Sequence, residues 1–223
     1  MACFELFDPL TMSDALEINY TTTDFAVDDL DHPAWNQANF VRVTKYWSGE
    51  TAPIERQFTA RLLWSDEALY VRFDAAQYEP LIVSDTPDLS QKSIGLWDRD
   101  VCEIFVAPDA GQPDRYYEFE VAPTGEWLDV AIEKSADGRK ADWDYHSGMT
   151  VASRIETDKV ISSTRIPWST FDRQPSSGDE WRGNLYRCVG QDPTRGYLAW
   201  LPTLTLEPSF HVPEKFGRFV FTK

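Results

Sequence analysis

Carboxylates gathered in two short segments are the residues of this chain that could do chemistry. Asp98, Asp100 and Glu103 lie in the first segment, and Glu118 and Glu120 lie in the second. Both segments are typical of β-strands, and neighbouring strands would bring these side chains together. Two acids that flank a sugar at about 5.5 Å, or about 6.5–9.5 Å, can hydrolyse its glycosidic bond. No EF-hand spacing accompanies the aspartates, so they are weak evidence for calcium.

The standard motifs of other enzyme classes are absent from the sequence. It contains no Gly-x-Gly dinucleotide loop, no Gly-Lys-Ser/Thr phosphate loop, no His-Glu-x-x-His and no Gly-x-Ser-x-Gly. The only histidines are His32, His146 and His211. A catalytic triad or a three-histidine zinc site would therefore need loops that are far apart in the sequence.

Aromatic residues offer a second kind of chemistry, the binding of sugars. A sugar ring has an apolar face, which stacks on an aromatic plane, and a rim of hydroxyls, which hydrogen-bond to polar side chains. Trp97 lies at a junction between a loop and a strand, close to the acids, and is a candidate for the platform or for the core. Four other tryptophans occupy strand-like or capping positions and are expected in the core: Trp35, Trp64, Trp168 and Trp200.

The charge of the chain restricts its partners. Its 37 acidic and 21 basic residues give a net charge of -16 over 223 residues. A negative surface repels nucleic-acid backbones and anionic lipids, so we expect neither nucleic acid nor membrane as a partner. The N-terminus lacks the basic and apolar regions of a signal peptide. The localisation is therefore unknown, with the cytoplasm expected for the chain as written.

The elements that must position these residues are predominantly β-strands. Residues 61–64 and 68–74 form a predicted hairpin, whose second strand alternates apolar and polar residues with the period of two of a half-buried strand. Long helical segments are absent, which favours an all-β, antiparallel two-sheet sandwich. We expect long surface loops at 77–96 and 134–148. We predict an N-terminal extension over 1–27, partly ordered, and one domain over 28–223. Further strands are expected at 40–47, 101–106, 116–121, 127–132, 160–166, 185–189, 197–201 and 216–221.

Six segments in the same order resemble the family-9 carbohydrate-binding modules. The most specific is Leu96-Trp-Asp-Arg-Asp-Val-Cys-Glu-Ile-Phe-Val106, which is similar to the Trp-x-x-Asp-x-x-Glu-(Ile/Val)-(Phe/Tyr) signature of that family. The resemblance implies a DOMON-like, immunoglobulin-like sandwich that binds a terminal sugar of a polysaccharide or oligosaccharide without catalysis. In the family such modules serve glycoside hydrolases in carbohydrate catabolism. The other five segments are 60–71, 116–125, 165–168, 181–187 and 210–217.

The resemblance also implies which residues bind the sugar. Trp97 and Phe210 fall on the two clamping aromatics, Glu103 on a glutamate that grips hydroxyls, and Tyr186 on a glutamine beside the ring. The binding arginine of the family falls on Glu120, which replaces a cation with an acceptor. Arg187 is a candidate to supply the missing charge, and His211 lies close enough to Phe210 in sequence to touch a ligand. Arg99 is a further candidate for that charge.

Two other functions remain open at this point. The DOMON-like sandwich also hosts b-type haem, and the candidate axial ligands here are His146, Met149 and His211. A glycoside hydrolase or lyase would use Glu103, Glu118 and Glu120. We expect no required cofactor, with a structural calcium ion as an additional expectation from the resemblance; no metal ligands are assigned.

Overall fold

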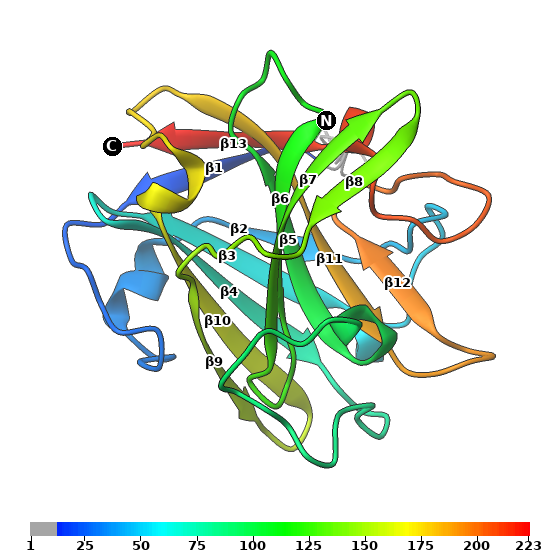
Figure 1. The fold of residues 1–223 in the computed structure, drawn as a ribbon. Coiled ribbons are helices and arrows are strands. Elements are labelled where there is room, and N and C mark those ends of the chain that lie inside the picture. Colours follow the sequence, from blue (N-terminus) through cyan, green and yellow to red (C-terminus); the bar gives the residue numbers. More distant parts are fainter. Residues whose placement is uncertain (1–12) are drawn as a thin grey trace, which may run out of the picture.

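The computed structural model describes residues 13–223. Within the predicted N-terminal extension, Ala15–Tyr20 form the first strand, β1, while residues 1–12 lie outside the described part. Residues 13–223 form thirteen strands and five short 3-10 helices (Figure 1). No helix among the described residues is long and apolar enough to cross a membrane.

The strands follow one another along most of the chain. After β1 they are β2 (Phe40–Val43), β3 (Phe58–Trp64), β4 (Ala68–Ala76), β5 (Val101–Ala107), β6 (Arg115–Val121), β7 (Trp127–Ser135), β8 (Gly138–Asp142), β9 (Thr150–Ile155), β10 (Lys159–Pro167), β11 (Glu180–Val189), β12 (Gly196–Ala199) and β13 (Gly217–Thr222). The 3-10 helices are η1 (Pro33–Gln37), η2 (Ile54–Arg56), η3 (Leu96–Asp98), η4 (Trp168–Phe171) and η5 (Pro213–Lys215).

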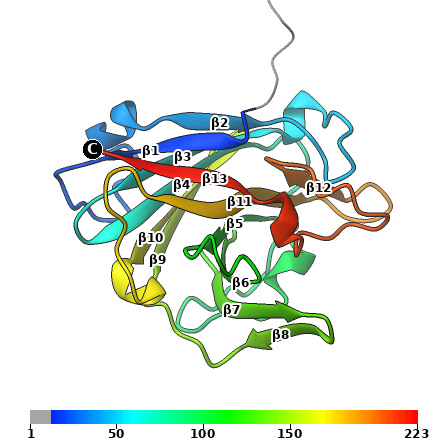
Figure 2. The ribbon, with the colours of Figure 1, turned by 90° about the horizontal axis from the view of Figure 1, so that it is seen from above.

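Hydrogen bonds join all these strands into one continuous sheet. Its order is β8-β7-β6-β5-β11-β13-β1-β3-β4-β10-β9, with β12 added on β11 and β2 added on β3. The sheet curls so that its β9 end reaches the third strand from its other end: the Ser153 hydroxyl of β9 donates to the Ala122 carbonyl just after β6 at 2.9 Å. Seen from above, the β7–β8 hairpin lies on the opposite side of the molecule from β2 (Figure 2).

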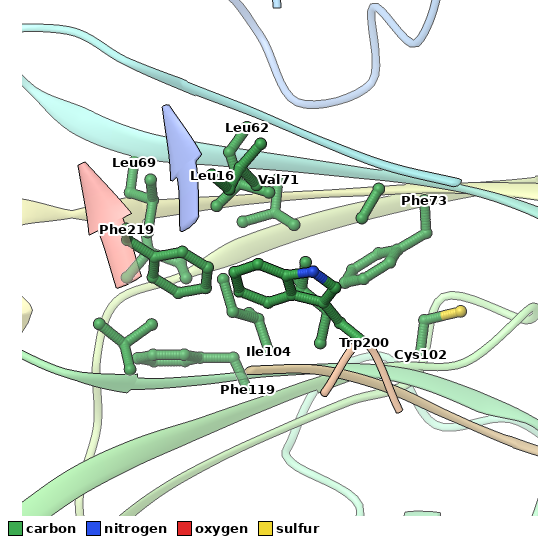
Figure 3. Close-up of a cluster of buried hydrophobic side chains, with 14 of the residues drawn as sticks. Leu16, Leu62, Leu69, Val71, Phe73, Cys102, Ile104, Phe119, Trp200 and Phe219 are labelled. Carbon is green, nitrogen blue, oxygen red and sulfur yellow. The ribbon is translucent and has the colours of Figure 1, made fainter. Parts of the chain in front are cut away.

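The main core fills the space inside this curl. Leu62 and Val71, from β3 and β4, face Ile104 and Phe119, from β5 and β6, with the Trp200 indole between them (Figure 3). Burying such side chains contributes roughly 1.5–3 kcal/mol each. The four tryptophans expected in the core are all buried: Trp35, Trp64, Trp168 and Trp200.

The all-β prediction is confirmed, while three details differ. The strands form one curled sheet instead of two separate sheets, because β1 links β13 to β3 by hydrogen bonds. β1 is parallel to both neighbours, so the sheet is not purely antiparallel. The predicted loop at 134–148 contains the end of β7 and the whole of β8, whose polar sequence carries no apolar alternation because nearly all of the strand is exposed. The predicted loop at 77–96 is irregular through residue 95.

A second apolar cluster lies on the outer face of the same strands. Alternation along β5 sends Cys102, Ile104 and Val106 into the main core and turns Glu103 and Phe105 the other way. The outer cluster joins residues of β5, β6, β7 and β11 to Phe210 and Phe216. This outer face, covered by loops, carries the candidate site.

Candidate functional site: an aromatic pocket over three buried glutamates

A pocket of about 340 Å³ opens on the outer face of β5 and β6. Its wall combines aromatic side chains with acids, which suits a ligand that has both an apolar face and polar groups. It brings together four of the residues expected from sequence: Trp97, Glu103, Phe210 and His211. Its other lining residues are Asp98, Phe105, Glu118, Ile132, Arg139, Ala141, Trp143, Cys188, Tyr197, Pro208 and Ser209.

Trp97 stands at the mouth of the pocket on helix η3. Gly95, with φ of +85°, turns the chain into this helix in a left-handed conformation that side chains rarely adopt. The Arg195 guanidinium donates to the carbonyl of Trp97 at 2.5 Å and to that of Arg99 at 2.9 Å, which holds the middle and the C-terminal end of the helix. With its backbone held, the Trp97 ring remains 36% exposed.

The aromatic partner of Trp97 is Trp143, which sequence reasoning missed. Their ring centroids are 6.0 Å apart, with planes tilted by 36°, and Trp143 is 40% exposed. Trp143 directly follows β8. Its signal in the sequence was an aromatic side chain inside a polar, turn-rich stretch, where nothing local requires one. Two exposed tryptophans on one pocket mark a surface for stacking.

Phe210 and Tyr186 play a more structural part than expected. Phe210 lines the pocket but is only 8% exposed, because it stacks on Tyr186 with centroids 4.1 Å apart and planes at 10°. The Tyr186 hydroxyl donates to the Phe210 carbonyl at 3.0 Å, and its ring is fully buried. Tyr186 therefore supports Phe210 from below and is not among the residues that line the pocket, which corrects its expected place beside the ligand.

Arg187 is on the wrong face to serve the pocket, and its expected role was wrong. Strand alternation turns Arg187 away from its neighbours Tyr186 and Cys188, which face the outer cluster. Its buried guanidinium donates to the carbonyls of Arg56 at 2.8 Å and Ala76 at 2.7 Å. It is a structural cation that ties β11 to the end of β4.

Replacing Arg187 with methionine is expected to lower the free energy of unfolding by about 3 kcal/mol, because two part-buried backbone carbonyls lose their buried donor. Denaturant unfolding measures this change. Arg42→Met, on the exposed face of β2, removes the same charge and should change stability by less than about 0.5 kcal/mol. Equal stability of the two variants would contradict the structural role of Arg187.

His211 closes one side of the pocket as a neutral ring. Its Nδ1 atom lies 3.0 Å from the Tyr116 hydroxyl, and its Nε2 atom lies 4.0 Å from a carboxylate oxygen of Glu118. Burial, together with the charges of Arg139 and Lys134, lowers the pKa of His211 to about 3. The imidazole therefore offers hydrogen bonds and no positive charge.

Three glutamates meet at the base of the pocket. Glu103 on β5 and Glu120 on β6 are direct cross-strand partners, and Glu118 lies two residues from Glu120 on the same face. Oxygen atoms of the three carboxylates all lie within 4.8 Å of one another. Glu103 and Glu118 line the pocket, whereas Glu120 is fully buried, and no donor reaches its oxygens unless it shares a proton with Glu118.

Burial raises the pKa of all three carboxyl groups. For Glu118 it raises the pKa to about 7. For Glu103 the charge of Glu118 adds to burial, and for Glu120 the charges of Glu103 and Glu118 both add to it, so that both pKa values lie well above the ordinary range. The thiol of Cys188 donates to Glu103 at 3.5 Å. The group therefore holds protons at neutral pH unless a cation replaces them.

This arrangement bears on the two alternative functions. The acids of a glycosidase flank the scissile bond, whereas Glu103, Glu118 and Glu120 lie side by side on one wall. The three candidate haem ligands occupy separate environments. Met149 packs in the main core, His211 lines the pocket, and His146 is exposed. The candidate haem ligands are therefore not assembled at one site.

The fold and the pocket define an all-β ligand-binding module with an aromatic, acidic site. Comparison with known proteins agrees with this class and identifies the family. The chain belongs to the carbohydrate family 9 binding domain-like family, whose sequence model matches residues 27–223.

One relative and two solved structures illustrate the range of similar proteins. A protein of Arthroderma benhamiae called an extracellular protein is 26% identical over 190 residues, which cover 77% of this chain and 83% of that protein. A candidate carbohydrate-binding protein from Bacteroides uniformis has a TM-score of 0.73 and 19% identity, over 93% of this chain and 98% of that one. A family 9 module from Caldicellulosiruptor kristjanssonii, in complex with cellotriose, has a TM-score of 0.66 and 15% identity, over 93% of both chains. The last two likenesses show the fold.

Proposed function

We propose that this chain binds a terminal sugar unit of a polysaccharide or oligosaccharide without transforming it. The observation that carries the proposal is the pair of exposed tryptophans, Trp97 and Trp143, above a floor that contains Glu103 and Glu118. An indole plane covers the C–H face of a sugar, and carboxylates and His211 reach its hydroxyls. Each hydrogen bond contributes only about 0.5–1.5 kcal/mol net, so we expect affinities of about micromolar to millimolar.

Family membership supports this proposal. The Caldicellulosiruptor kristjanssonii module has been solved with cellotriose and with glucose, which makes glucose and its β-linked oligomers the first ligands to try. We further propose that the curled sheet is a variant of the DOMON-like sandwich, with β1 bridging its two halves. In this proposal the chain is an accessory module in carbohydrate catabolism and has no catalytic step.

Calorimetry with glucose, xylose, cellobiose and cellotriose tests the proposed function. Wild-type protein should release heat with at least one of them, and Trp97→Ala should weaken that binding at least about tenfold, because the stacking surface is removed. Tyr78→Ala removes an exposed aromatic outside the pocket and should bind as the wild type does. Absence of heat with every sugar, or an unchanged Trp97→Ala variant, would reject the proposal.

The same samples test the absence of catalysis. Reducing ends should not accumulate when the protein is incubated with these oligosaccharides. A product that forms with wild-type protein and disappears with Glu103→Gln would instead identify a glycoside hydrolase that uses the paired carboxylates.

A further inference from the structure

The three glutamates at the base of the pocket carry more negative charge than their surroundings balance. Within residues 13–223, no lysine or arginine side chain lies within ion-pairing distance of Glu103, Glu118 or Glu120. The nearest cationic influences are Arg195 on Glu103 and Arg139 on Glu118, neither of which forms an ion pair with them. A buried carboxylate without a partner is costly, so each of the three must be neutralised by a bound proton or by a cation.

The surroundings of Glu120 alone also indicate that a neutralising partner is missing. Its side chain is fully buried, and apart from the carboxyl group of Glu118, which can share a proton with it, neither of its oxygens has a hydrogen-bond partner in the described protein. Buried polar groups are nearly always satisfied, so an orphaned carboxylate indicates a missing partner. The carboxylate points at its two neighbours, whose oxygens lie within 4.8 Å of it.

We propose that Glu103, Glu118 and Glu120 bind a divalent cation of the calcium type at the base of the pocket. Oxygen ligands lie about 2.3–2.6 Å from Ca²⁺, so two ligands on opposite sides of the ion are about 4.6–5.2 Å apart. The separation of at most 4.8 Å between the three oxygens is compatible with one ion among them. All three ligands are carboxylates, which Ca²⁺ prefers over nitrogen and sulfur.

Charge balance favours a divalent ion over an ammonium group. Three ionised carboxylates carry three negative charges, of which a single ammonium would neutralise one and Ca²⁺ two. Three carboxylates supply at most six oxygens, and Ca²⁺ takes six to eight ligands. Glu103 and Glu118 open on the pocket, so the remaining positions of the ion face it. Sugar hydroxyls would complete the coordination there; this step rests on the proposed function.

Terbium luminescence tests the ion directly, without any sugar. Tb³⁺ replaces Ca²⁺, and the tryptophans that line the pocket should sensitise its emission in wild-type protein first freed of metal with a chelator. Added Ca²⁺ should quench the signal by competition. Glu120→Gln keeps the shape of the side chain and should weaken Tb³⁺ and Ca²⁺ binding at least about tenfold.

Two further variants serve as controls for the ion-binding measurement. Glu17→Gln, on the exposed face of β1, makes the same change of charge and should bind as the wild type does. Glu118→Gln should repeat the loss seen with Glu120→Gln, and circular dichroism should show all variants folded. No sensitised emission in wild-type protein, or equal affinities in wild type and a folded Glu120→Gln, would overturn the proposed ion site.

Calorimetry with sugar, in Ca²⁺ and in chelator, separates this inference from the proposed function. Sugar binding that is equal in both conditions, with no terbium signal, would reject the proposed ion site and leave the proposed sugar binding supported. A terbium signal that Glu120→Gln removes, with no heat from any sugar, would support the proposed ion site and reject the proposed sugar binding. Sugar binding that is at least about tenfold tighter in Ca²⁺ would support both.

Discussion

Metal-free protein carrying Glu120→Gln is expected to be more stable than the wild type at pH 8 and to lose less stability between pH 5 and pH 8. In the wild type, burial raises the pKa of Glu118 from an ordinary value of 4.5 to about 7, and the pKa values of Glu103 and Glu120 rise in the same direction. Replacing Glu120 removes one of the three mutually repelling charges, so the remaining two ionise at lower free energy.

The direction of the pH effect follows from proton binding. Between the unfolded and folded pKa values of Glu118, the folded chain holds a proton that the unfolded chain has released, so stability falls as the pH rises. The full contribution is present below about pH 4.5 and is lost as the pH passes about 7; for Glu118 alone it amounts to about 3 kcal/mol. The other ionisable groups that face the cluster are Asp98, Tyr116, Arg139, Tyr186, Cys188, Arg195 and His211.

Urea unfolding of chelator-treated protein at several pH values measures this effect. Glu17→Gln serves as the matched control because its carboxylate is exposed on β1, and its profile should parallel that of the wild type. Parallel profiles for wild type and Glu120→Gln would show that the cluster does not titrate with the pKa values given above.

Replacing Gly183 with alanine is expected to lower the free energy of unfolding by about 3 kcal/mol or more. Gly183 lies in β11 between Val106 of β5 and Gly217 of β13. An added methyl group would lie 2.1 Å from a ring carbon of Phe219 and 2.5 Å from the carbonyl oxygen of Phe105. Phe219 is fully buried, so its ring has no open space to enter, and the backbone of β5 cannot yield without breaking its ladder.

Thermal unfolding checks this prediction, with a loss of roughly 6–12 °C expected for a chain of this size. Gly111→Ala is the control, since Gly111 lies in an exposed turn and the nearest atom there belongs to the side chain of Asp109. A melting temperature for Gly183→Ala within about 2 °C of the control would contradict the close packing described for β11.

Much of the fold could be predicted because alternation is a local property. The strands β4 and β6 alternate apolar and polar residues, since one side of each faces the main core, and β5 is an apolar run broken only by Glu103. β8 was not predicted, because its residues are nearly all exposed and its sequence therefore has no alternation of apolar and polar residues. The parallel pairing of β1 was equally invisible, because it depends on residues about 200 positions away.

Site residues that belong to one short sequence motif were predicted, whereas residues that only the fold brings to the pocket were missed. Trp97 and Glu103 lie within one short motif and both line the pocket. Trp143 comes from a different hairpin, and only the path of β7 and β8 brings it to Trp97. Arg187 was misplaced because its candidacy rested on charge alone, whereas strand alternation sends it to the opposite face.

The position of β1 determines how short a chain can be and still fold as described. β1 lies between β13 and β3, yet the family match begins at residue 27, after this strand has ended. A chain that starts at residue 27 would leave the facing edges of β13 and β3 unpaired in the middle of the sheet. Unpaired edges recruit strands from other molecules and promote aggregation. The minimal folding unit therefore begins no later than Ala15, twelve residues before the family match.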